Sequence, residues 1–183
     1  LHEEKLSLKY NVRFNEQIID LKQKVDNLTV KYDSINVSKA NLQLSSVILR
    51  VENDGDKSFT QNLYDENYLP GMIFKGAKIL KYDISSTSTK YLESQLQLNQ
   101  IGKDSLQYNN VILDPSDFFE IKVLAIHSDS IKPEIDYFGK IAGIKGATLS
   151  PALPPTENTI FSKALEGDVE VQLLKGFIYP LLT

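Results

Sequence analysis

The sequence predicts an all-β protein built as an antiparallel β-sandwich. Two long segments, 41–56 and 111–128, alternate apolar and polar residues and adjoin turn signals, as half-buried strands do. About seven to nine such strands, with turn residues roughly every 8 to 15 positions and little helical periodicity, fit two packed sheets. A closed barrel is the alternative, because the pattern along single strands does not distinguish the two architectures.

The first long segment changes the phase of its apolar residues. Leu42 and Leu44 are even-numbered, whereas the alternating set that follows, Val47, Leu49 and Val51, is odd-numbered. A one-residue change of phase is what a β-bulge produces, so we predict a bulge at 45–46. The strand is expected to end at 53–56 (Asn-Asp-Gly-Asp), where Asp-Gly supplies the positive φ angles of a tight reversal.

The second long segment has the complementary layout. Residues 114–117 (Asp-Pro-Ser-Asp) predict a turn, and the odd-numbered residues from 119 to 125 are apolar and predict a buried strand face. Glu120 and Lys122 lie on the other face, which is therefore expected to be partly wet, as in an antiparallel sheet with one buried side.

The rest of the first 149 residues supplies shorter elements. The expected elements, in chain order, are a strand at 6–12, a short helix or loop at 15–24, strands at 28–32 and 35–37, an irregular segment at 57–71, a hairpin or two edge strands from 72–74 and 77–84, a polar loop at 85–90, a strand at 106–113 and a last strand through 135–144.

The chain is expected to contain one sandwich domain, 1–149, followed by a proline-rich linker and C-terminal segment, 150–183. Three prolines at 151–155 cannot continue a strand ladder. Thr156 is a candidate cap for a short helix, so the tail is expected to be partly helical. The run 173–182 is strongly apolar but well below the roughly 20 residues of a spanning helix. Both a buried final element and the first turns of a membrane span fit this run.

Composition restricts the class of protein. With 24 acidic and 20 basic residues the chain carries a formal charge of -4, and no basic block forms a surface for phosphates, so nucleic acid is not an expected partner. The chain contains no cysteine, which excludes disulfides and thiolate metal sites. Its one methionine is Met72, which indicates a piece of a longer protein.

The sequence offers few candidates for catalysis. His2 and His127 are the only histidines, and no G-x-S-x-G, H-E-x-x-H or glycine-rich phosphate motif is present. Because a general base needs a partnered nucleophile, His127 is interpreted as a surface or strand-end residue. We therefore expect no catalytic residue and a protein that is not an enzyme.

Carboxylates and amides near the turns are the other candidates. Oxygens of Asn53, Asp54, Asp56 and Asp117 could bind calcium, but a turn explains the same residues, and the closing glutamate of a calcium loop is missing. Glycoside hydrolysis needs two facing carboxylates, for which the loop acids are candidates. No metal and no cofactor are expected. The loop acids are Asp65, Glu66, Asp114, Asp117 and Asp129.

Aromatic residues are frequent in the middle of the chain. Tyrosine presents an apolar ring and a polar hydroxyl, so an exposed row of such residues would bind sugar or peptide, whereas buried ones would belong to the core. The residues concerned are Tyr64, Tyr68, Phe74, Tyr82, Tyr91 and Tyr108.

Two turn-adjoining segments carry a resemblance. Residues 51–55 (VENDG) resemble the V-x-N-x-G strand end of bacterial immunoglobulin-like and adhesion-type sandwich domains, and 113–121 (LDPSDFFEI) resemble their L-x-P-G-D/E-x-x-x-I pattern, with Ser116 in place of glycine. Together with 6–10 (LSLKY) and 138–144 (FGKIAGI), they make residues 1–149 similar to a group of uncharacterised bacterial membrane-anchored proteins carrying one such domain. The resemblance implies an immunoglobulin-like fold and an envelope or membrane association, and carries over no catalytic residues.

The strand pattern, the missing catalytic motifs and the apolar run 173–182 lead to one expected function. We expect a non-enzymatic β-sandwich domain of a membrane-associated, extracytoplasmic protein, which binds another protein or takes part in an assembly. Any membrane contact would use segments outside this chain, and no small-molecule ligand is indicated. The alternative is a carbohydrate-binding or glycoside-processing module that uses exposed tyrosines and loop carboxylates.

Overall fold

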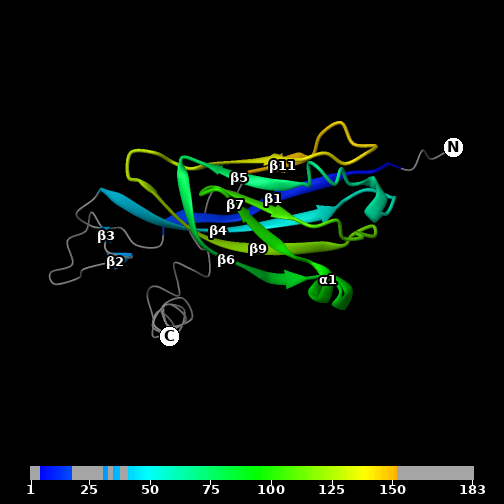
Figure 1. Ribbon diagram of the computed structural model, residues 1–183, viewed down its shortest axis with the longest axis horizontal. Helices are drawn as coiled ribbons and strands as arrows, with labels where there is room; N and C mark the ends of the chain where they lie inside the picture. Colours follow the sequence, from blue (N-terminus) through cyan, green and yellow to red (C-terminus); the bar gives the residue numbers. More distant parts are fainter. Residues whose placement is uncertain (1–4, 18–30, 33–34, 38–40, 152–183) are drawn as a thin grey trace, which may run out of the picture. The chain divides into compact units, whose positions relative to one another are not determined.

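The computed structural model describes residues 5–17, 31–32, 35–37 and 41–151, which lie in one compact unit, Leu1–Ala152 (Figure 1). The strands are β1 (Leu8–Gln17), β2 (Lys31–Tyr32), β3 (Ile35–Asn36), β4 (Leu42–Asn53), β5 (Gly71–Lys75), β6 (Ala77–Thr87), β7 (Leu98–Ile101), β8 (Ser105–Tyr108), β9 (Phe118–Ser128), β10 (Glu134–Phe138) and β11 (Thr148–Ser150). The helical elements are a 3-10 turn, η1 (Gln61–Leu63), and the α-helix α1 (Lys90–Gln95).

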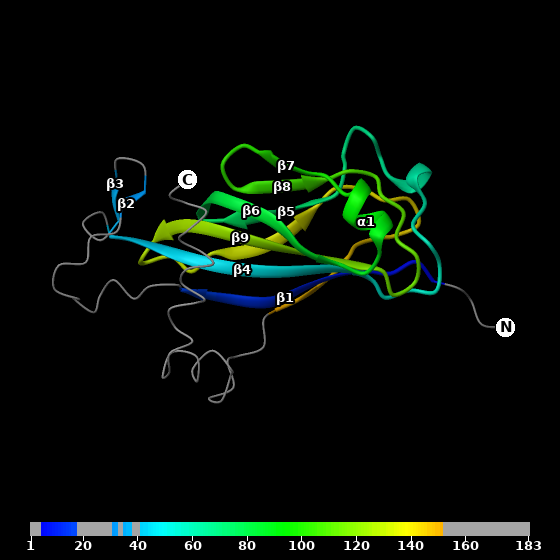
Figure 2. The ribbon, with the colours of Figure 1, turned by 90° about the horizontal axis from the view of Figure 1, so that it is seen from below.

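These strands form two main sheets, which confirms the prediction of an all-β sandwich. One sheet has the order β11-β1-β4-β9-β6 and the other β10-β5-β8-β7, while β2 and β3 pair separately. Figure 2 shows β5, β7 and β8 on one side of the β4–β9 pair. The buried core draws side chains from both sheets, among them Leu49 of β4, Phe74 of β5 and Ile121 of β9. Within the described residues, no helix is long and apolar enough to cross a membrane.

The antiparallel pair β4–β9 is the centre of the five-stranded sheet. It runs without interruption from Leu42 opposite Ser128 to Glu52 opposite Phe118. Odd-numbered residues of both strands face the second sheet, as the alternation predicted, and Leu49 and Ile121 are completely buried there. Each fully buried aliphatic side chain contributes roughly 1.5–3 kcal/mol to folding.

The predicted bulge at 45–46 is wrong. No irregularity interrupts β4, and the extra residue lies in β1, where the register against β4 shifts between Val12 and Phe14. The apolar phase changes for another reason. Leu44 lies on the outer face of the sheet opposite Ile126, so that face is apolar at this end of the strand.

The predicted pairing of 72–74 with 77–84 is also wrong. β5 and β6 belong to different sheets, and the chain passes from one sheet to the other at Gly76, whose φ is +81°. Positive φ there requires a residue without the steric conflict of a Cβ atom. β6 is an edge strand of its sheet, as one of the two alternatives had it, whereas β5 is an interior strand.

Two further boundaries differ from the prediction. The segment 85–90 is not one polar loop, because β6 continues to Thr87 and Thr89 caps α1, its hydroxyl oxygen accepting a hydrogen bond from the Leu92 amide at 3.3 Å. The predicted strand 106–113 is shorter, since β8 ends at Tyr108. Leu92 is completely buried, which anchors the short helix against the core.

The segment 15–24 is predicted as a short helix or loop, but its first three residues belong to a strand, because β1 continues to Gln17. The remainder of that segment lies outside the described residues, as does most of the predicted strand 28–32, of which β2 is the described part. The linker and tail from 152 onward, including the apolar run 173–182, also lie outside them.

The predicted last strand through 135–144 is shorter, because β10 spans only Glu134–Phe138. β10 ends at Phe138, and Gly139 follows with a φ of +102°. β11 then pairs with β1 in the parallel direction, so the described sheets are antiparallel except at this edge. The long connection that parallel pairing requires is available, since most of the chain separates the two strands.

Two tyrosine hydroxyls join the sheets inside the core. Tyr10 of β1 and Tyr108 of β8 are almost completely buried, and their hydroxyl oxygens lie 2.8 Å apart. The Tyr10 ring stacks on Tyr137 of β10 with centroids 5.4 Å apart, and the Tyr108 ring meets Phe119 edge-on at 5.1 Å. Burial raises the pKa of both phenols, because the low-dielectric core disfavours the phenolate.

We expect stability to fall steeply at alkaline pH. The unfolded chain releases the phenolic protons near the ordinary pKa of 10.0, while the folded chain holds them to higher pH, so folding free energy is lost as pH rises above about 10. Each such tyrosine adds about 1.4 kcal/mol of loss per pH unit. Urea unfolding between pH 8 and 11.5 should show a shallower loss in the Tyr10→Phe/Tyr108→Phe double variant, and an unchanged slope would contradict this account.

Candidate functional site

A pocket opens where β4 begins and β9 ends. It has a volume of about 370 Å³ and combines amide, hydroxyl, imidazole, carboxylate and ammonium side chains with two apolar residues. It is lined by Asn15, Gln43, Ser45, His127, Asp129, Ser130, Ile131, Lys132 and Pro133. These residues come from β1, β4, β9 and the loop between β9 and β10.

The strand register brings Ser45 and His127 together. Ser45 is opposite Ala125, and Gln43 is opposite His127, so Ser45 and His127 are diagonal neighbours on the inward, odd-numbered face. Diagonal neighbours across an antiparallel pair are within reach of long side chains. The Ser45 Oγ lies 2.7 Å from the His127 Nε2.

A backbone carbonyl selects the tautomer of His127. The His127 Nδ1 lies 2.8 Å from the Ser128 carbonyl oxygen, which can only accept a hydrogen bond, so Nδ1 carries the proton. In the neutral ring Nε2 then has a lone pair, and the Ser45 hydroxyl donates to it. Of the two positions predicted for His127, the strand end is confirmed, since it lies next to the last residue of β9. The surface position is not, since His127 is only 7% exposed and Ser45 only 5%.

Asn53, the first of the candidate calcium ligands, belongs to a turn. The Asn53 side chain is completely buried, donates to the carbonyl oxygens of Lys57 and Leu113 at 2.8 and 2.9 Å, and accepts from the Gly55 amide at 3.0 Å. Among the residues that the structure describes, no group of three or more His, Cys, Asp or Glu side chains is placed to hold a metal. Asn53 therefore acts as a clamp between two loops.

A glycine is needed at position 55 because of close packing, and not because of a positive φ angle. Its φ is not positive, contrary to the prediction for Asp-Gly. A Cβ atom at Gly55 would instead lie 2.3 Å from the Lys5 carbonyl oxygen, because the chain after β4 passes against the start of the first strand. Ser116 adopts the positive φ, at +70°, where the resembling domains carry glycine.

The loop carboxylates serve separate purposes. Asp117 accepts hydrogen bonds from the Asp114 amide and the Ser88 hydroxyl, and Asp114 accepts from the Ser58 hydroxyl at 2.6 Å, which holds the predicted turn closed. The Asp65 carboxylate caps its own loop through the Asn67 amide. Of the loop acids considered, Asp129 lines the pocket.

The aromatic residues do not form one exposed row. Tyr64, Phe74 and Tyr108 are buried in the core, and the Tyr64 hydroxyl donates to the Val111 carbonyl oxygen at 2.7 Å. Tyr68 and Tyr91 are exposed, but one packs against Phe138 and the other belongs to α1. A sugar-binding strip of these residues is therefore not present on the described surface.

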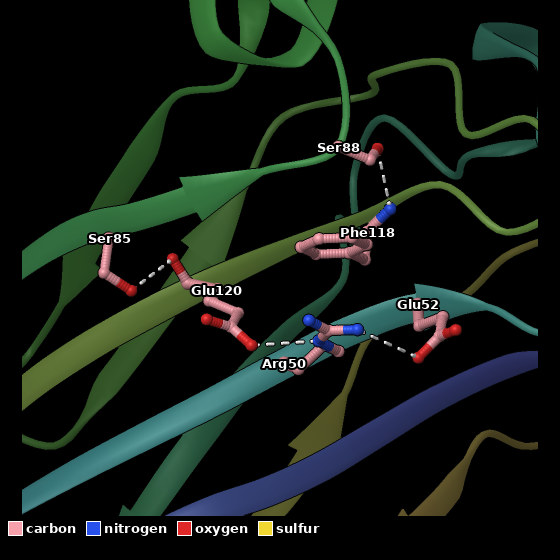
Figure 3. Close-up of polar contacts among 6 residues, drawn as sticks. All are labelled: Arg50, Glu52, Ser85, Ser88, Phe118 and Glu120. Carbon is pink, nitrogen blue, oxygen red and sulfur yellow. Dashed lines mark hydrogen bonds and ion pairs between the residues drawn. The ribbon is translucent and has the colours of Figure 1, made fainter.

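A charged cluster lies on the outer face of the five-stranded sheet (Figure 3). The Arg50 guanidinium lies 3.7 Å from the centre of the Phe118 ring, its Nε donates to the Glu120 carboxylate at 2.9 Å, and the Glu52 carboxylate is 3.9 Å away. Cross-strand pairing of Arg50 with Glu120 produces this arrangement. The cluster covers an aromatic ring at the end of the sheet and places one cation between two carboxylates.

Comparisons with known proteins give little. No family model matches the chain, and no curated protein matches it. Two solved structures of a GH20 exo-β-N-acetylglucosaminidase from Vibrio harveyi, one with N-acetylglucosamine and one of an inactive mutant, share 11% identity with it at TM-scores of 0.30 and 0.25. Each alignment covers 84% of this chain and 19% of the enzyme, so the chain spans about a fifth of the enzyme's length. Likeness at this level carries no argument about function.

We predict that Asn53 is a principal stabilising residue. Asn53→Ala removes the buried side-chain hydrogen bonds to the Lys57 and Leu113 carbonyl oxygens and from the Gly55 amide, and should cost about 2–3 kcal/mol of unfolding free energy, measured by urea denaturation. Asn62→Ala is the control, because Asn62 is exposed and should change stability by no more than about 0.5 kcal/mol. Equal effects of the two substitutions would contradict the role of a clamp.

Proposed function

We propose that this chain is a protein-binding domain that receives an extended peptide segment of its partner along the free edge of β7. The observation that carries the proposal is the character of this edge. Residues Leu98–Ile101 are uncharged, the pairing of β7 with β8 shows no shift of register, and Asn99, Gln100 and Ile101 are exposed. Unpaired strand edges of this kind accept added strands in many peptide complexes.

The other sheet edges carry features that oppose strand addition. β6 has irregularities between Ile79 and Lys81 and between Ile84 and Ser86, and β11 is only three residues long. β10 carries Asp136, which forms an ion pair with Lys75 at 2.7 Å. Bulges, short length and charges are the usual means by which edges avoid association. Among the described edges of the two main sheets, β7 and β11 have neither a register shift nor a charged residue, and the four residues of β7 make it one residue longer than β11.

The hydrogen bonds around β8 show which backbone groups of β7 point outward. The Tyr108 amide donates to the Pro70 carbonyl oxygen, toward β5, so Tyr108 and its partner Leu98 form a non-hydrogen-bonded pair. The amide and carbonyl of Leu98, and by alternation those of Gln100, therefore point away from β8. They are the groups that a fifth strand would bind.

The chemistry of the edge defines the occupant. An added strand would pair with Leu98 and Gln100 through its backbone and would lie beside Asn99 and Ile101, of which Ile101 is 46% exposed. An extended segment of alternating apolar and uncharged polar residues from another protein fits these neighbours. The alternative of carbohydrate binding has no comparable support, since the exposed tyrosines are separated.

We also propose, from the sequence alone, that the domain works in a membrane-associated, extracytoplasmic protein with an immunoglobulin-like fold. The support is the apolar run 173–182 and the resemblance of 1–149 to membrane-anchored sandwich proteins. Fractionation of cells expressing the full-length protein would test it, and recovery of the protein in the cytosolic fraction would overturn it.

The proposal for β7 is tested by removing one outward amide. Peptides of six to eight residues, about the length of an ordinary strand, are selected from a display library against the full chain. Gln100→Pro removes an amide that points away from β8, so the fold is retained while peptide affinity should fall at least about tenfold. Gln100→Ala is the matched control, because it keeps the amide and loses only the side-chain hydrogen bond to Gly102.

Amide hydrogen exchange supplies the second measurement. Bound peptide should slow exchange at Leu98 and Gln100 more than elsewhere. Equal affinity of the selected peptides for the Gln100→Pro and Gln100→Ala variants, or protection at another edge, would overturn the proposal. So would a library that yields no binding peptide.

A further inference from the structure

We propose that Ser45 is a nucleophile activated by His127, and that the pocket at the start of β4 takes a small polar acyl ester. This inference is independent of the proposed binding edge, which lies in the other sheet. If it holds, the sequence-based expectation of a protein without catalytic residues is wrong.

The arrangement of three groups supports this role. A hydroxyl donates to an imidazole at 2.7 Å, and the second ring nitrogen donates to a fixed acceptor at 2.8 Å. This is the nucleophile, base and orienting group of serine hydrolases, with the Ser128 carbonyl in the place of the usual carboxylate. The carbonyl holds the tautomer in which Nε2 can take the proton from Oγ.

The position of the pair within the pocket is the second observation. Ser45 and His127 are nearly buried, yet both line a cavity of about 370 Å³, which is large enough for a small ligand. Asn15, Gln43 and Lys132 also line this cavity. Amide N–H groups and an ammonium are the donors that stabilise the negative oxygen of a tetrahedral intermediate.

The reaction is balanced by water. The Ser45 Oγ forms a bond to the acyl carbon while its proton passes to the His127 Nε2. The bond between the acyl carbon and the alkoxy oxygen then breaks, and the alcohol leaves with the proton from Nε2. A water molecule next attacks the acyl-serine, gives its proton to Nε2, and releases the carboxylic acid as Ser45 recovers its proton.

A purely structural pair is the competing explanation. In that case the serine and histidine only satisfy one another at the end of the core, and removing either changes stability alone. The two explanations differ in chemical reactivity, because a structural hydroxyl does not react with an electrophile faster than other serines.

Labelling of the full chain with a small fluorophosphonate distinguishes them. We expect the modification on Ser45, identified by peptide mass spectrometry, with labelling reduced at least about tenfold in Ser45→Ala and His127→Gln. Ser46→Ala is the matched control, since Ser46 is the next residue, is similarly buried at 3% exposure, and lies on the opposite face of β4. Circular dichroism establishes that each variant is folded.

The absence of cysteine allows a test that does not depend on hydroxyl reactivity. The variant Ser45→Cys contains a single thiol, and the neighbouring imidazole should lower the pKa of that thiol. Iodoacetamide should therefore modify it at neutral pH at least about tenfold faster than it modifies the same thiol in Ser45→Cys/His127→Gln. Equal rates in these two variants, or fluorophosphonate labelling of the wild-type chain that does not select Ser45, would overturn the proposal.

Discussion

The register between β4 and β9 is the constraint on which the rest of the structure depends. Side chains alternate between the two faces of a strand, so a slip of one residue would turn Leu49 outward and separate every cross-strand pair. The same register pairs Arg50 with Glu120 on the outer face and brings Ser45 to His127 on the inner one. Core, charged cluster and pocket are therefore consequences of one alignment.

Side chains at one end of this pair hold the alignment. Asn53 ties the end of β4 to Leu113, and the carboxylates of Asp114 and Asp117 close the turn that leads into β9. The Ser116 amide also donates to the Asn53 carbonyl oxygen at 2.9 Å. Polar residues that looked like candidate metal ligands are thus used in fixing where the two strands begin to pair.

The local sequence pattern predicted some features of the fold correctly and others incorrectly. The alternation of apolar residues from Val47 to Val51 predicted the buried face of β4, since the period of a strand is two. It failed at Leu44, because an apolar outer face produces the same change of phase as a bulge. Crossing from one sheet to the other at Gly76 depends on distant partners. The partner of His127 is 82 residues away, so no spacing motif could have identified it.

The packing of the core does not explain why polar residues lie at the end of the core where the pocket opens. On the inward face of β4 and β9, apolar residues continue as far as Val47 and Ala125, and then Ser45, Gln43 and His127 follow. Replacing a satisfied buried polar pair by apolar residues of similar shape is often neutral or stabilising. Apolar residues of similar shape are therefore compatible with this end of the core. The polar lining is therefore not a requirement of the core, and it is the feature on which the proposed reaction of Ser45 depends.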